Sequence, residues 1–241
     1  NGDFVASDLD GFGWHGAMNY QGFMRPLWNW INQNSSIGGG FQGLPFEMPK
    51  IGGKSLVASM VQFSSSIPWR SLVASMVLLD SHDTARMRTV VSGDRKAHLS
   101  AMTAMLTYPG VPSIFAGDEI GLEGSWGEDS RRTINWEDRS GWDHDFLAEA
   151  KKLIELRRTQ DGLIEGGLRW VAVEDNFICY LRESNKQSVL VFISRKAVRT
   201  EIDLAGYGLK VVKTLYGPDA TGGSIKIDSD GATQGIWEVK S

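Results

Sequence analysis

The feature that most constrains the fold is an apolar run that ends in charged residues. The run extends from Leu72 to Leu79, and the motif LLDSHDTAR (78–86) overlaps its end. A continuous apolar run of this length predicts a strand that is buried on both faces, as in a parallel sheet covered by helices. His82 and Asp83 would then lie just beyond the C-terminal end of the strand, where parallel α/β barrels place their functional groups.

Alternating strands and helices are predicted up to about residue 160. The expected strands are 16–19, 72–79 and 111–117, and the expected helices are 23–33, 55–63, 94–107 and 146–158. A glycine-rich connection from Ser35 to Gly53 separates the first two helices. The heptapeptide SLVASMV occurs at 55–61 and again at 71–77, which is too short to indicate a structural repeat.

Beyond residue 162 the pattern changes to seven short runs separated by turn residues. The runs are LRWVAVE, FICYLRE, SVLVFIS, TEIDL, VVKTLY, SIKID and GIWEVK. Short alternating or apolar runs at this spacing predict an antiparallel β-sandwich. We therefore predict two domains, one of alternating strands and helices at 1–162 and a β-sandwich at 163–241.

The composition is that of an ordinary globular protein, with 41% hydrophobic residues, 22% charged residues and a formal net charge of −4. No long run of lysine and arginine occurs and no apolar run reaches membrane-spanning length, so we expect neither a nucleic-acid nor a membrane partner. Cys179 is the only cysteine, which argues against a cysteine metal site. His15, His98 and His144 lack metal-ligand spacing, and we predict no metal and no cofactor.

Four motifs in order along the chain resemble the alpha-amylase family of glycoside hydrolases, in its neopullulanase, cyclomaltodextrinase and maltogenic amylase branch. GWHGAMNY (13–20) is similar to the sixth-strand segment of that family. LLDSHDTAR (78–86) resembles the seventh-strand motif, with Ser81 where Asn is more usual. YPGVPSIFAGDEIG (108–121) resembles the eighth-strand signature, and EDSRRTINW (128–136) resembles the arginine-containing segment that follows.

The resemblance implies an α/β fold, in which the C-terminal part of a (β/α)8 TIM barrel is followed by an antiparallel β-sandwich. About three β/α units cannot close an eight-stranded barrel. We therefore expect the missing N-terminal half of the barrel to come from the same gene or from an associated chain. The resemblance also implies retaining catalysis by a nucleophile and a general acid, both expected before residue 1, with the acid a few residues upstream.

The resemblance assigns roles to individual side chains. Asp83 is expected to be the third catalytic carboxylate, which hydrogen-bonds sugar hydroxyls and favours the transition state, and His82 is expected to donate to the same sugar ring. The expected substrate-binding residues are Arg86, Asn19, Tyr20, Arg131, Arg132 and Trp136. Structural alternatives stay open: Arg86 could orient a carboxylate or a loop, paired loop arginines often form exposed salt bridges, Asn19 suits a turn, and Glu119 suits an anchoring role.

The sequence supports two hypotheses about function. In the first, the chain is part of a retaining hydrolase or transglycosylase that cleaves α-1,4 bonds, with α-1,6 bonds as a second candidate, in maltodextrins, cyclodextrins or starch. This chain alone would then be inactive, whereas a proteolytically nicked enzyme whose other half stays bound would be fully active. In the second, it is a non-catalytic, truncated amylase-like module that binds a glucan or a protein. We expect a soluble protein, and the choice between the cytoplasm and secretion stays open.

Overall fold

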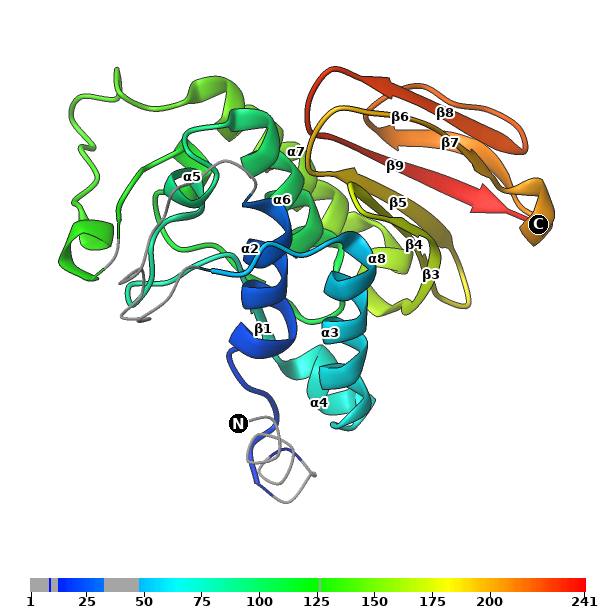
Figure 1. Ribbon diagram of the computed structural model, residues 1–241, viewed down its shortest axis with the longest axis horizontal. Coiled ribbons are helices and arrows are strands. Elements are labelled where there is room, and N and C mark those ends of the chain that lie inside the picture. Colours follow the sequence, from blue (N-terminus) through cyan, green and yellow to red (C-terminus); the bar gives the residue numbers. More distant parts are fainter. Residues whose placement is uncertain (1–8, 10–12, 33–47, 126) are drawn as a thin grey trace.

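The computed structural model describes residue 9 and residues 13–32, 48–125 and 127–241. Most of the expected glycine-rich connection lies outside the described residues. Among the residues that are described, two regions follow one another along the chain (Figure 1). The first is mainly helical and contains a short pair of parallel strands, and the second is formed by antiparallel strands.

The first region contains a series of helices around the short parallel pair. Its helices are η1 (Tyr20–Met24), α2 (Arg25–Ile31), α3 (Gly53–Ser65), α4 (Trp69–Ala74), α5 (Met87–Val90), α6 (Arg95–Thr107), η3 (Asp118–Ile120), η4 (Gly127–Arg131), α7 (His144–Thr159) and α8 (Asp161–Glu165). Its strands are β1 (Met76–Leu78) and β2 (Val111–Ser113). Helix α6 begins as expected, because the Asp94 side chain accepts a hydrogen bond from Ala97 N and caps its first turn.

The expected strand at 72–79 is wrong over its first half, because residues 69–74 form helix α4. Pro68 precedes this helix and its carbonyl accepts hydrogen bonds from Ser71 N and Leu72 N. These bonds close the first turn, and the fixed φ of proline favours the start of a helix. Only the following three residues, Met76–Leu78, form the strand β1.

The other two expected strands are also shorter than predicted. Residues 16–19 contribute a single parallel bridge, between Met18 and Met76, and 111–117 forms only the strand β2. Strand β2 was expected to be buried, but Val111 is 52% exposed. Within the described part of the chain β2 pairs only with β1, so its other edge has no neighbouring strand.

All seven runs of the second region form strands, as predicted. They are β3 (Gly167–Glu174), β4 (Phe177–Glu183), β5 (Ser188–Ser194), β6 (Val198–Asp203), β7 (Lys210–Tyr216), β8 (Ser224–Ser229) and β9 (Thr233–Lys240). Five of them form an antiparallel sheet in the order β3-β4-β5-β9-β7, and β6 pairs with β8 separately. A short 3-10 helix, η5 (Ala205–Tyr207), follows β6.

Both faces of the five-stranded sheet are buried at its centre. On one face Val189, Val191 and Ile193 of β5 belong to the same apolar cluster as the helices of the first region. On the other face Leu190 and Phe192 pack in a second cluster with residues of β6 and β8. Two buried faces explain why β4 and β5 are continuous apolar runs instead of alternating ones.

Buried arginines from the sheet region cap helices of the first region. Arg182 of β4 donates hydrogen bonds to Thr107 O, the last carbonyl of α6, and to Gly166 O. Arg195 donates to Trp30 O at 2.6 Å and to Ile51 O at 2.7 Å. The last carbonyls of a helix lack partners within the helix and favour a cation nearby. These bonds therefore tie the two regions together.

Replacement of Arg182 by leucine tests this link. The Arg182→Leu variant leaves buried carbonyls without donors, and we expect the free energy of unfolding to fall by about 3 kcal/mol. The matched control is Arg169→Leu, which removes the exposed ion pair with Glu183 and should cost less than about 1 kcal/mol. Denaturant unfolding measures both values. Equal costs for the two variants would contradict the account.

Candidate functional site

A tight turn after β1 presents His82 and Asp83 to solvent. Thr84 Oγ1 accepts a hydrogen bond from Ser81 N at 2.9 Å, and Thr84 N donates to Ser81 O at 3.1 Å. Asp83 N donates to Ser81 Oγ at 3.1 Å. These bonds fix the backbone of the turn, while the His82 and Asp83 side chains remain 59% and 64% exposed.

Arg131 joins His82 and Asp83 in one polar group. His82 Nε2 lies 3.3 Å from Asp83 Oδ1, and Arg131 Nη2 lies 3.5 Å from the same oxygen. Arg131 Nε also donates to the backbone carbonyl of His82 at 3.0 Å. The structure therefore brings together three predicted site residues from two separate segments of the chain.

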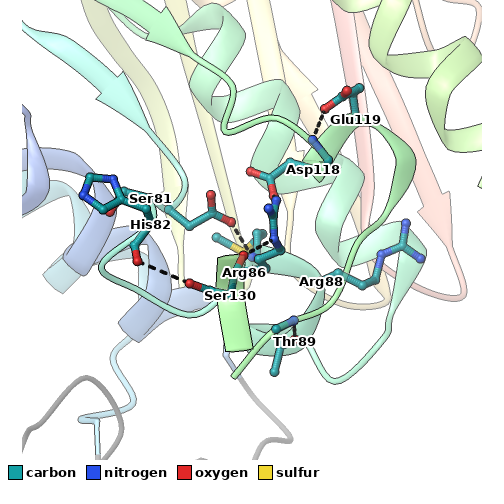
Figure 2. Close-up of polar contacts among 12 residues, drawn as sticks. Ser81, His82, Arg86, Arg88, Thr89, Asp118, Glu119 and Ser130 are labelled. Carbon is teal, nitrogen blue, oxygen red and sulfur yellow. Dashed lines mark hydrogen bonds and ion pairs between the residues drawn. The ribbon is translucent and has the colours of Figure 1, made fainter. Parts of the chain in front are cut away.

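Arg86 lies beneath this turn and does not reach solvent. Its Nη1 donates to Asp118 Oδ1 at 2.9 Å, and its Nε donates to Ser130 O at 2.9 Å. Ser130 Oγ lies 3.4 Å from His82 O, while its shorter hydrogen bond, at 2.8 Å, is donated to Gly127 O. Figure 2 shows Arg86 between Asp118 and Ser130. Its role as a substrate ligand stays a prediction, and the burial of its side chain favours a structural role instead.

The loop that carries Asp118 depends on a glycine. Gly117 has a φ of +108°, in the region that disfavours other residues, and a Cβ there would lie 2.4 Å from Leu122 Cδ1. Glu119 Oε2 accepts a hydrogen bond from Gly117 N at 2.8 Å. Glu119 thus contacts the backbone of its own loop (Figure 2), in agreement with the anchoring role considered for it.

The Asn19 and Tyr20 side chains form hydrogen bonds within the protein, and only Tyr20 reaches the turn after β1. The Asn19 side chain is buried, and its Oδ1 caps η1 by accepting a hydrogen bond from Gly22 N at 2.8 Å. Tyr20 OH donates to Ser81 Oγ at 2.8 Å. Tyr20 thus supports Ser81 and Asn19 supports the start of η1, and sugar contacts by either of them stay a prediction.

Arg132 and Trp136 lie on the exposed segment after η4. Arg132 Nη2 lies 2.7 Å from Asp129 Oδ1, which is the exposed salt bridge that the structural alternative anticipated. Trp136 is 60% exposed and packs edge-on against Trp142, with ring centroids 5.4 Å apart. An exposed indole face beside a second aromatic ring suits stacking on a sugar.

Buried acids lie directly behind the turn. Burial raises the pKa of Asp118 well above its ordinary value, and the neighbouring carboxyl of Asp80 raises this pKa further. Burial also raises the pKa of Asp80, although a hydrogen bond from Met87 N opposes the shift. This pair was not predicted from the sequence. The one signal for it is that an acidic residue follows each of the two apolar runs, 72–79 and 111–117.

His98 lies in a second buried network, below the helix that follows the turn. Arg88 Nε donates to His98 Nδ1 at 3.1 Å, and Arg88 Nη2 donates to Asp143 Oδ2 at 3.0 Å. The His98 ring stacks on Phe146 with centroids 4.3 Å apart. Burial, and then the charge of Arg88, hold the pKa of His98 well below its ordinary value, so the ring is neutral.

The exposed group formed by His82, Asp83 and Arg131 can bind a polyhydroxylated ligand. Its carboxylate accepts hydrogen bonds, and its guanidinium and imidazole can donate them. Within the described ranges no three His, Cys, Asp or Glu side chains are placed to hold a metal ion. No helix of the described chain is long and apolar enough to cross a membrane.

Comparison with known proteins identifies the class to which this fold and site belong. The family model described as the catalytic domain of alpha amylase matches residues 17–162, which is more than half of the chain. The chain therefore belongs to the alpha-amylase family, a family of glycoside hydrolases. This result confirms the resemblance predicted from the four motifs.

Relatives with curated names come from the predicted branch. A cyclomaltodextrinase of a Bacillus species is 35% identical over 141 residues, which cover 58% of this chain and 24% of the relative. An intracellular maltogenic amylase of Bacillus subtilis is 34% identical over 130 residues, which cover 53% of this chain and 22% of the relative. This chain thus aligns with about a quarter of the length of these relatives.

Solved structures share the fold across nearly the whole chain. A debranching enzyme of Nostoc punctiforme superposes with a TM-score of 0.81 at 24% identity, covering 96% of this chain and 49% of the other. A cyclic α-maltosyl-(1→6)-maltose hydrolase of Arthrobacter globiformis gives a TM-score of 0.74 at 22% identity, with 96% and 47% covered. At these identities the similarity establishes the fold alone.

The neutral His98 predicts a dependence of stability on pH. Because its pKa is lowered in the folded state, the unfolded chain binds a proton that the folded chain does not, once the pH falls below about 6.5. The free energy of unfolding should therefore decrease with falling pH, by up to about 1.4 kcal/mol per pH unit. At pH values above the pKa of His98 in the unfolded chain, the ionisation of His98 should not affect the free energy of unfolding.

Denaturant unfolding of wild type and His98→Gln at several pH values measures this effect. Glutamine can still accept the bond from Arg88 but does not titrate. We expect the stability difference between the two proteins to be constant above pH ~7 and to shift against wild type below pH ~6. Parallel curves over the whole range would show that His98 is not buried in its neutral form.

Proposed function

We propose that this chain is part of a retaining glycoside hydrolase that cleaves α-1,4-glucosidic bonds in maltodextrins, cyclodextrins or starch, with α-1,6 bonds as a second linkage. The observation that carries the proposal is the exposed group of His82, Asp83 and Arg131 on the turn after β1. Family membership supports it, and relatives named cyclomaltodextrinase and maltogenic amylase indicate the substrate class.

In this proposal the first region is the C-terminal part of a (β/α)8 barrel, and the second region is a C-terminal β-sandwich domain. The domain boundary would lie near residue 162, within the short helix α8 that precedes β3. The parallel pair β1 and β2 would be the seventh and eighth barrel strands. Met18, Met76 and Val111 are 38–52% exposed on and beside this pair, and the remaining barrel strands would cover them.

Asp83 would act by contact with the sugar that reacts. Its carboxylate would accept hydrogen bonds from sugar hydroxyls that strengthen as the ring approaches an oxocarbenium-like transition state. His82 would donate to the same ring through its imidazole, and Arg131 would hold both groups at the distances seen here. Neither Asp83 nor His82 would form a covalent bond to the substrate.

The covalent steps would belong to groups outside this chain. Retention requires a carboxylate nucleophile and a second carboxyl group that serves as acid and then as base. In the proposal both come from the N-terminal half of the barrel, which is either the preceding part of the same polypeptide or an associated chain. This chain alone should therefore hydrolyse no glucan.

The Asp83→Asn substitution in the complete enzyme tests the proposal. Asparagine keeps the size of the side chain but removes the charge, and we expect kcat to fall about 10²–10³-fold. Reducing-sugar release from maltodextrin or cyclodextrin measures the loss. Unfolding should be unchanged within about 0.5 kcal/mol, because the side chain is exposed.

A matched control separates this effect from the loss of any exposed acid. Asp228 of β8 is similarly exposed and also pairs with an arginine, Arg199, at 3.0 Å. Asp228→Asn should retain wild-type turnover. Normal turnover of Asp83→Asn would contradict the proposal, and binding of maltodextrin without any turnover by the complete protein would favour the non-catalytic module instead.

Trp136 should contribute to glucan binding through its exposed ring. We expect Trp136→Ala to weaken binding of a maltooligosaccharide about tenfold, a loss that corresponds to about 1.4 kcal/mol. Isothermal titration measures the change. Trp69→Ala is the control, because Trp69 is 47% exposed but lies on α4, away from the segment after η4. Equal effects of the two substitutions would exclude a specific role for Trp136.

A further inference from the structure

A pair of carboxyl groups lies buried directly behind the turn that carries His82 and Asp83. Asp80 and Asp118 are each about 2% exposed, and the carboxyl group of Asp80 lies near enough to Asp118 to raise its pKa. Asp118 Oδ1 accepts a bond from Arg86 Nη1 at 2.9 Å, and Asp80 Oδ2 accepts one from Met87 N at 2.6 Å. Within the described chain, the positive charge of Arg86 opposes the rise in pKa of both carboxyl groups.

The charges of this cluster do not balance if both acids are ionised. Two carboxylates and one guanidinium would leave one net negative charge without solvent, which is strongly unfavourable. In addition, no donor among the described residues reaches the buried Asp80 Oδ1. One proton on either carboxyl removes the net charge and supplies the donor for the bond between the two acids.

We propose that Asp80 and Asp118 are positioning residues that share a single proton, and that this pair, together with Arg86, holds the turn that presents His82 and Asp83. The cluster contacts both ends of the turn, because Asp80 directly precedes Ser81, and Arg86, the partner of Asp118, follows two residues after Thr84. Arg86 also donates to Ser130 O, and the next residue, Arg131, donates to His82 O at 3.0 Å. The role of the turn in glucan chemistry rests on the proposed function. The shared proton does not, because it is argued from the burial and charge of the acid pair.

Two single substitutions reproduce the protonated pair without a titrating proton. In Asp118→Asn the amide oxygen can accept from Arg86 while the amide nitrogen donates to Asp80 Oδ1. In Asp80→Asn the oxygen can accept from Met87 N while the nitrogen donates to Asp118. Each variant contains one carboxylate and one guanidinium, so the cluster remains neutral and should fold.

The shared proton predicts how the stabilities diverge with pH. The folded chain retains a proton that the unfolded acids, with pKa values near 3.9, release. Wild type should therefore lose stability as the pH rises above about 4, relative to either asparagine variant. Between about pH 5 and pH 7 the ratio of unfolding constants, wild type to variant, should rise by up to tenfold per pH unit.

Unfolding of the 241-residue chain in denaturant at several pH values provides the test. Asp94→Asn is the control, because Asp94 also accepts a backbone N–H but has no carboxyl partner in the described structure, and its curve should stay parallel to that of wild type. Parallel curves for both Asp80→Asn and Asp118→Asn would overturn the shared proton. Infrared absorption of wild type at neutral pH adds a test without variants, in which absence of a protonated carboxyl band would also overturn it.

Hydrogen exchange tests the positioning role separately. We expect faster exchange at the amides of Asp83 and Thr84, which bond to Ser81, in Asp118→Ala than in wild type, with rescue in Asp118→Asn. Amides of α7 should exchange at the wild-type rate in both variants. Unchanged exchange in the turn of Asp118→Ala would overturn the positioning role. Both experiments need no glucan, so a loss of the proposed function would leave their outcome intact.

Discussion

The buried guanidinium of Arg86 is the interaction on which the site depends. It joins the turn after β1, the loop that carries Asp118 and the segment that carries Ser130. These three segments are far apart in sequence, and each has few regular backbone bonds of its own. An unpaired guanidinium at this depth would be very costly, so its partners must stay in place. This constraint explains how exposed side chains can keep a defined geometry on short, irregular segments.

The elements that the sequence predicts best are those whose own pattern decides their structure. The seven strands after residue 166 and the helix capped by Asp94 follow directly from their residues. The heptapeptide SLVASMV shows the limit, because its first copy lies within α3 while its second copy spans the end of α4 and the start of β1. The same seven residues thus fold differently, and Pro68 and the bonds of neighbouring segments decide which structure forms.

The residues of the site also differ in how well the sequence predicts them. Asp83 and His82 were identified from one local motif, and their exposure on a turn agrees with that interpretation. An orienting role of Arg86 toward a carboxylate or a loop was considered, but its burial and its partner Asp118 were not predicted, because the two residues are 32 positions apart and their contact depends on how the loops pack. Ser81 was noted only as a departure from the family pattern, yet its hydroxyl accepts bonds from Tyr20 and from the backbone of Asp83.

A crystal structure of the complete enzyme with a bound maltooligosaccharide tests most directly whether Asp83 contacts the sugar that reacts. The account predicts sugar hydroxyl oxygens within about 2.6–3.2 Å of the Asp83 carboxylate and of His82 Nε2 on the same ring. It also predicts that the bonds of Arg86 to Asp118 and Ser130 are unchanged. A sugar bound elsewhere in an otherwise complete active site, with Asp83 still facing solvent, would contradict the account.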